Sequence, residues 1–137
     1  MNDLGDKTMN IEIQILAAVG VLLLLLTLIQ GTRNVLVLGL PAAAGNQHDI
    51  APWTGWHDRL NRAIRNLIEA IVIYAPIAVV VSILGVGTDT SAFGAQIFLS
   101  ARILHAVVYT AGIPWIRTVA WFAGVVGIAM VGSPLLG

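Results

Sequence analysis

The stretch that decides the fold is residues 58–81, DRLNRAIRNLIEAIVIYAPIAVVV, where a polar helical face continues into an apolar segment without a break. Four polar side chains recur here at spacings of three, four and seven residues, which places them along roughly one face of a helix. They are Arg62, Arg65, Asn66 and Glu69. Most residues between them are apolar. Buried charges are costly unless they are paired, ligated or hydrated, so this polar face requires a partner or a ligand.

The composition is typical of a membrane protein. Of the 137 residues, 58% are hydrophobic and only 10% are charged, and the mean hydropathy is +0.89. This length predicts a single domain over residues 1–137. A formal net charge of zero gives no indication of a nucleic-acid partner. The absence of cysteine excludes disulfides and a cysteine nucleophile in this chain.

Four apolar segments predict four membrane-spanning helices. They cover about residues 11–30, 58–84, 92–113 and 118–136. The first contains the run VLLLLLTLI, and about 20 such residues span a hydrocarbon core of roughly 30 Å. A cleaved signal peptide is the alternative, but the residues before this run are acidic rather than basic. We therefore predict an all-α integral membrane protein built as a four-helix bundle.

The basic residues predict the orientation of this bundle. Five arginines lie near one membrane face, whereas the other face has only Lys7. The five are Arg33, Arg59, Arg62, Arg65 and Arg117. The positive-inside rule places them in the cytoplasm and both termini on the other side. Residues 31–57, which hold several glycines and prolines, are expected to form a loop on the cytoplasmic side.

A second polar stripe lies on the third predicted helix. Arg102, His105 and Tyr109 follow the spacing i, i+3, i+7, and Arg102 falls about halfway along the span. A charge at that depth must face protein or water. The two stripes can therefore meet in one cavity open to the cytoplasm. Arginines outnumber carboxylates there, which favours an anionic ligand bound through bidentate guanidinium contacts.

Two motifs carry a resemblance to a known family. Residues 62–74, RAIRNLIEAIVIY, and residues 101–118, ARILHAVVYTAGIPWIRT, resemble the MAPEG family, the membrane-associated proteins in eicosanoid and glutathione metabolism. The chain looks like a bacterial-type member similar to the microsomal glutathione transferases. Val72 stands where a proline is common and Tyr74 where phenylalanine is usual, but neither departure removes a ligand. The resemblance implies four-helix protomers packed as a homotrimer in a bacterial inner membrane, with glutathione bound between neighbouring protomers.

The resemblance also implies roles for individual residues. Arg117 matches the arginine that family members aim at the glutathione thiol, and Tyr109 and Thr118 are the further candidates for catalytic hydrogen-bond donors. The glutathione-binding set would comprise Arg33, Arg62, Arg65, Asn66, Glu69, His105 and Tyr109.

The chemistry of glutathione fits these side chains. Its two carboxylates suit arginines, and Glu69 can orient an arginine or accept the ammonium group. A free thiol has a pKa of about 8.5, and lowering it by about two pH units needs roughly 2.7 kcal/mol of differential stabilisation. A guanidinium in a poorly solvated pocket supplies interactions of this kind. The second substrate would be a lipophilic electrophile or hydroperoxide that arrives from the bilayer.

Two other functions are open at this stage. The chain could be a non-catalytic membrane protein that binds glutathione or another small anion. It could also be a small transporter with Arg102 and His105 as an intramembrane relay. A glutathione-dependent transferase or peroxidase is the leading hypothesis.

Structural roles compete for the same residues. The arginines that begin the second helix could form an interfacial patch for lipid headgroups. Glu69 could pair with Arg65 or Arg62, and Arg102 could bridge helices. The pairs His48–Asp49 and His57–Asp58 lack the spacing of a metal site, so we expect no metal.

Overall fold

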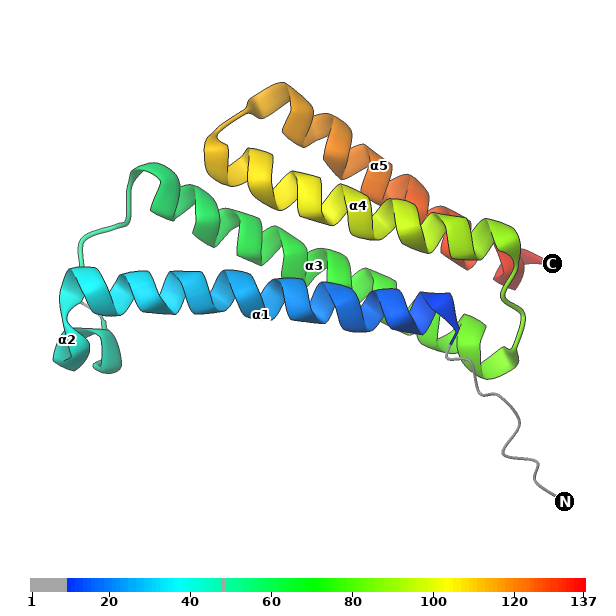
Figure 1. The fold of residues 1–137 in the computed structure, drawn as a ribbon, viewed down its shortest axis with the longest axis horizontal. Helices are drawn as coiled ribbons and strands as arrows, with labels where there is room; N and C mark the ends of the chain where they lie inside the picture. Colours follow the sequence, from blue (N-terminus) through cyan, green and yellow to red (C-terminus); the bar gives the residue numbers. More distant parts are fainter. Residues whose placement is uncertain (1–9, 48) are drawn as a thin grey trace, which may run out of the picture.

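The computed structural model describes residues 10–47 and 49–137. Lys7 and His48, used in the topology and metal arguments, lie outside the described residues. Within them the chain forms five α-helices and a terminal 3-10 helix (Figure 1). These are α1 (Ile11–Leu38), α2 (Leu40–Ala44), α3 (Gly55–Leu84), α4 (Asp89–Ala111), α5 (Pro114–Gly132) and η1 (Ser133–Leu136).

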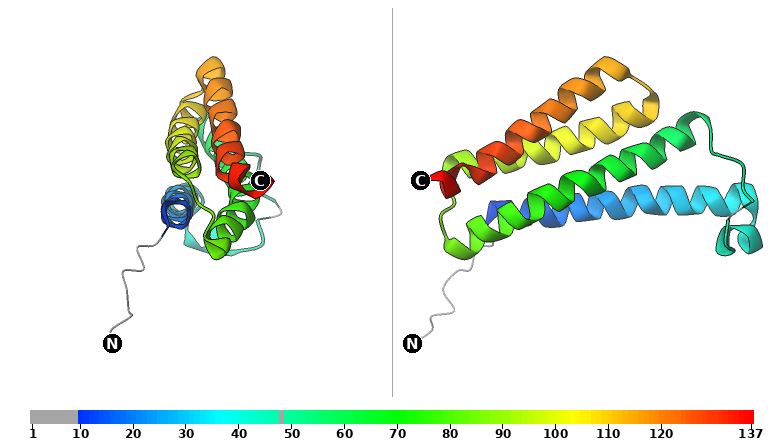
Figure 2. Two further views of the ribbon diagram at one scale, coloured as in Figure 1. Left: turned by 90° about the vertical axis from the view of Figure 1, so that its right-hand side faces the viewer. Right: turned by 180° about the vertical axis from the view of Figure 1, so that it is seen from behind.

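The predicted four-helix membrane bundle is confirmed. Four segments are long and apolar enough to cross a bilayer: Ile11–Leu38, Gly55–Leu84, Asp89–Ala111 and Pro114–Leu136. The beginning of α1 and the end of the chain lie at one end of the bundle, and the α4–α5 turn lies at the other (Figure 1). The α4–α5 pair tilts away from α1 towards that turn (Figure 2). The chain is therefore an integral membrane protein, with four candidate spans in residues 10–47 and 49–137.

Each spanning helix extends beyond its predicted bounds at one end, whereas α4 ends at Ala111 and α5 at Gly132, before the predicted residues 113 and 136. The first helix continues through Gly31 to Leu38, because an isolated glycine inside a helix costs only about 1 kcal/mol. The predicted loop over residues 31–57 also contains the short helix α2. Pro114 is the first residue of α5, a position where its missing N–H costs nothing. Arg117 consequently lies in the first turn of a helix and not in a connection.

A polar network closes the end of the bundle away from the arginines. The Glu12 side chain is buried, and its carboxylate accepts a short hydrogen bond from the Ser91 hydroxyl. The Tyr74 hydroxyl donates to the Glu12 carbonyl oxygen over 2.9 Å, and its ring stacks on Phe98 with centroids 4.3 Å apart. These contacts join α1, α3 and α4. The spacing arguments did not identify Glu12, because a single acid near a helix start resembles an ordinary N-terminal charge.

Glycines set the distance between α4 and α5. A Cβ atom added at Gly127 would lie 2.7 Å from the Gly94 carbonyl oxygen and 2.8 Å from the Phe98 nitrogen. Both atoms belong to the α4 backbone, which cannot move aside as a flexible side chain can. The two helices therefore pack backbone against backbone, which small residues permit in membrane-spanning helices.

This contact predicts the cost of adding a methyl group. Gly127→Ala should lower the free energy of unfolding by about 1–3 kcal/mol, the usual cost of overpacking. The matched control is Gly20→Ala in α1, where an added Cβ meets nothing within 4 Å. That control should be neutral or stabilising, because alanine favours a helix. Thermal unfolding in detergent compares the two variants, and equal behaviour would contradict the close α4–α5 packing.

Candidate functional site

The two predicted polar stripes meet at Arg102. Its Nη1 donates to the Asn66 side-chain oxygen over 3.3 Å, which links α4 to α3. Its Nη2 donates to the Trp121 carbonyl oxygen of α5 over 3.2 Å and, more weakly, to that of Ala120 over 3.5 Å. The side chain is only 3% exposed. One guanidinium therefore joins three helices, and this agrees with the helix-bridging role considered for Arg102.

A cleft of about 130 Å³ adjoins this guanidinium. Asn66, Glu69 and Arg102 contribute its polar lining, and apolar side chains of α3 and α5 complete it. Glu69 is exposed and forms no ion pair with Arg102, Arg62 or Arg65 among residues 10–47 and 49–137. Its carboxylate is thus available to an external cationic group, whereas the sequence left a structural pair with Arg65 or Arg62 open.

Gly124 makes room for the Arg102 guanidinium. A Cβ atom added at Gly124 would overlap the terminal nitrogen of Arg102 and approach its Cζ to 2.7 Å. This role of Gly124 was not predicted from the sequence. Its specific role could have been found from the buried face that Ala120, Gly124, Gly127 and Val131 share at spacings of four, three and four.

A second group of site residues lies where α4 turns into α5. The rings of His105 and Tyr109 meet edge to face with centroids 5.4 Å apart. The Arg117 Cζ lies 4.5 Å from the centre of the Tyr109 ring. His105 is buried, and Tyr109 and Arg117 are half-buried. The structure therefore brings these three predicted residues together, with the arginine against the face of the phenol ring.

The remaining predicted residues lie nearer the surface of the single chain. Arg62 is 63% exposed, and its Nε forms an ion pair with Asp58 over 2.9 Å. Such exposed pairs contribute about 0–1 kcal/mol, so little is lost when Arg62 binds another anion. Arg65 is also exposed and has no ion pair within the described ranges. The Thr118 hydroxyl donates to the Pro114 carbonyl oxygen, one turn earlier in α5.

Within one chain, Arg33 is not in contact with these residues. Its Cζ lies 4.6 Å from the centre of the Trp56 ring. Trp56 lines a cleft between α1, α3 and α4, whereas the cleft beside Arg102 involves α3, α4 and α5. The predicted set is therefore divided into the Arg102 cleft, the Tyr109 group, two exposed arginines and a separate Arg33.

The described residues contain no group of three or more histidine, aspartate or glutamate side chains that could hold a metal ion. His57 stacks on Trp53 with ring centroids 4.0 Å apart.

The family model of the MAPEG family matches residues 13–134. The chain belongs to the MAPEG family. Its members include glutathione transferases, peroxidases and related enzymes. No curated protein and no solved structure matches the chain at a significant level. The two motifs that carried the resemblance both lie inside the matched region, and so does every candidate site residue. Membership in the family does not by itself fix the reaction of this member.

The Arg102–Gly124 contact predicts a coupled pair of substitutions. Gly124→Ala should destabilise the protein by about 1–3 kcal/mol, because the new Cβ displaces the guanidinium. In an Arg102→Ala background the same change should cost less than about 0.5 kcal/mol, because the obstructing group is gone. Unfolding free energies of the four proteins in this cycle measure the coupling.

Gly127→Ala is the control for this cycle. Its added Cβ meets α4 backbone and not Arg102, so its cost should be the same in both backgrounds. An equal penalty for Gly124→Ala with and without Arg102 would show that the guanidinium does not depend on this glycine.

Proposed function

We propose that the protein is a membrane-bound glutathione-dependent transferase or peroxidase. The observation that carries this proposal is a surplus of guanidinium groups at one end of the bundle. The only ion pair there among the described residues is that of Arg62 with Asp58. Arg65 and Arg117 have no carboxylate partner in the described part of the chain. A tripeptide with two carboxylates would supply the missing negative groups.

The exposed face of α3 would provide most of the side chains that bind glutathione. Arg62 and Arg65 would hold its carboxylates. Arg33 lies on α1, outside this face, and would contribute only from there. Asn66 would bind the peptide group, and Glu69, which is free of ion pairs in the described chain, would accept the ammonium. His105 would offer a further hydrogen bond.

Activation of the thiol would depend on Arg117. Its guanidinium stabilises a thiolate more than a thiol, and this difference lowers the pKa of the thiol. Tyr109, which already packs against Arg117, and Thr118 would donate hydrogen bonds to the sulfur. With an electrophile, the thiolate sulfur forms a bond to carbon, and either the leaving group departs as an anion with the electron pair of the bond that breaks, or a polarised double bond opens and takes a proton from water. With a hydroperoxide, two glutathione molecules are oxidised to the disulfide while the hydroperoxide is reduced to an alcohol and water.

The assembly we propose is a homotrimer with the site between protomers. Arg62 and Arg65 are exposed on a bundle whose surface also carries many exposed large apolar side chains. A neighbouring protomer would shield these arginines from lipid and close the site over glutathione. The arginine-rich end would face the cytoplasm of a bacterial cell, with both termini outside the inner membrane. The lipophilic substrate would then enter laterally from the bilayer.

The thiolate signal of bound glutathione tests this proposal. Titrating glutathione into the detergent-solubilised protein should give a saturable ultraviolet thiolate absorbance near neutral pH. In Arg117→Ala the apparent pKa of the bound thiol should rise by about two pH units towards 8.5, and the signal at pH 7 should be lost. Glutathione binding itself, measured by calorimetry, should be weakened less than the ionisation.

Two further variants separate binding from activation. Arg65→Gln should weaken glutathione binding by about tenfold or more, because it removes a charge-assisted hydrogen bond worth roughly 1.5–3 kcal/mol. The charge-matched control is Arg59→Gln, whose Nε bonds to the Thr110 carbonyl oxygen and which is not assigned to glutathione. Binding without ionisation in the wild type would favour the non-catalytic alternative, and an absence of binding would refute the glutathione assignment.

A further inference from the structure

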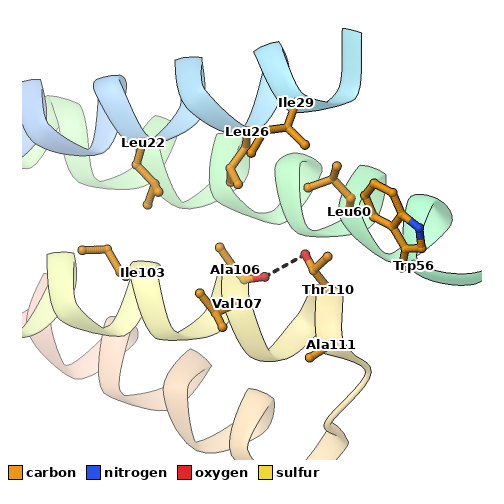
Figure 3. A pocket seen from close by; sticks show the side chains of 10 residues that line it. All are labelled: Leu22, Leu26, Ile29, Trp56, Leu60, Ile103, Ala106, Val107, Thr110 and Ala111. Carbon is orange, nitrogen blue, oxygen red and sulfur yellow. Dashed lines mark hydrogen bonds between the residues drawn. The ribbon is translucent and has the colours of Figure 1, made fainter. Parts of the chain in front are cut away.

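A second cleft, separate from the Arg102 cleft, lies between α1, α3 and α4. Its volume is about 440 Å³, within the range of roughly 300–1,000 Å³ that is usual for small-molecule sites. Leucine, isoleucine, valine and alanine side chains form most of its wall (Figure 3). The hydroxyl of Thr110 is directed to the Ala106 carbonyl oxygen over 2.8 Å, so it is already satisfied. The interior of this cleft therefore suits a hydrocarbon chain.

The cleft is open on the apolar surface of the single chain. Ile29 on α1 and Val107 on α4 both line it, and they are 50% and 62% exposed. A ligand in the bilayer could reach it without crossing water. Trp56, Thr110 and Ala111 lie together at one end, where α3 begins and α4 ends (Figure 3). A tryptophan at such a helix end is typical of the headgroup region of a membrane.

Two arginines border that same end. The Arg33 Cζ lies 4.6 Å from the Trp56 ring centre. The Arg59 Nε donates to the Thr110 carbonyl oxygen over 3.0 Å, and its side chain packs against Gly112 in the α4–α5 turn. Neither guanidinium has a carboxylate partner in the described ranges. The cleft thus combines an apolar body with an unneutralised cationic end.

Buried polar atoms at this end also lack partners. The Arg33 Nε, the Asn34 side-chain oxygen and both ring nitrogens of His57 are buried without a hydrogen bond among the described residues. Buried polar groups are nearly always satisfied, so this concentration requires an explanation. A phosphate oxygen is a suitable acceptor for a guanidinium N–H.

We propose that this cleft binds an anionic phospholipid of the surrounding bilayer. One acyl chain would occupy the space between α1, α3 and α4, and Arg33 and Arg59 would bind the phosphate. Charge complementarity selects an anionic lipid over a zwitterionic one, because two unpaired arginines remain net positive beside a neutral headgroup. The apolar cleft selects an intact lipid over a soluble phosphate. This site does not rest on the glutathione proposal, since it occupies a different cleft and Arg59 has no role in that proposal; Arg33 is the one residue that both proposals use.

Native mass spectrometry of the detergent-solubilised full-length protein tests this site. The protein is incubated with equal amounts of phosphatidylglycerol and phosphatidylcholine of identical acyl chains. We expect about tenfold preferential retention of phosphatidylglycerol. Arg59→Gln and Arg33→Gln should each reduce that preference several-fold, whereas Arg65→Gln, which removes an equal charge on another face of α3, should leave it unchanged.

Filling the cleft tests the acyl-chain part of the site. Ala106→Leu should lower retention of both lipids, because the larger side chain occupies the space of the chain. Ala106 is buried, so a larger side chain there can prevent folding. A second variant, Ala111→Phe, fills the same cleft from an exposed position and tests the site if Ala106→Leu does not fold.

Three results would overturn the proposal. The first is equal retention of the two lipids, unaffected by Arg59→Gln, which would indicate non-specific lipid adhesion. The second is competition by glycerol phosphate as strong as that by the intact lipid, which would indicate a soluble phosphate site. The third is undiminished lipid retention in a folded variant with a filled cleft.

Discussion

The buried guanidinium of Arg102 is the constraint on which the packing of α3, α4 and α5 depends. A cation midway along a membrane helix must be surrounded by hydrogen-bond acceptors, because leaving it unsatisfied at that depth is costly. The acceptors for its Nη1 and Nη2 come from the Asn66 amide of α3 and from backbone carbonyls of α5, whereas its Nε has no hydrogen-bond partner among the described residues. Those carbonyls can accept a second bond through their remaining lone pair. They lie within reach only because Gly124 has no side chain to hold α5 away.

The orientation of the Tyr109 group follows from the same constraint. Once Arg102 fixes the rotation of α4, His105 and Tyr109 must lie along the same face, three and seven residues further on. Gly112 then ends the helix with a φ of 83°, a left-handed conformation that suits glycine, and Pro114 begins α5. This short turn returns Arg117 to the ring of Tyr109. The proximity of Arg117 to Tyr109 is thus a consequence of one buried charge and one tight turn.

Residue spacing predicted the faces of the helices but not the neighbours of those faces. The stripes predicted on α3 and α4 meet at Asn66 and Arg102, but within one chain they do not share the single cavity that the sequence predicted, because the His105 and Tyr109 rings lie apart from the Arg102 cleft. The separation of Arg33 could not be predicted, because helical periodicity does not report how α1 rotates against α3. The pairing of Arg62 with Asp58 was also missed, although their spacing of four residues permits it. The sequence offered Arg62 more than one carboxylate at a suitable spacing, and only the side-chain geometry shows which of them it pairs with.

The length of α3 explains why its polar groups differ in exposure. Its 30 residues extend about 45 Å, which exceeds the roughly 30 Å of a hydrocarbon core, so part of the helix lies outside the core. Where that part is the N-terminal end of α3, its first turns lie in the headgroup region. Arg59 and Arg62 belong to those turns, where water and phosphates can compensate a charge. Asn66 and Glu69 lie deeper and are grouped with Arg102 around one small cleft. In the proposed function, a soluble anion entering from the arginine-rich end would need to penetrate only as far as Arg65 to contact this deeper group. An apolar reactant would approach the same level through the bilayer, so that the polarity gradient along α3 would give two reactants of opposite solubility separate routes.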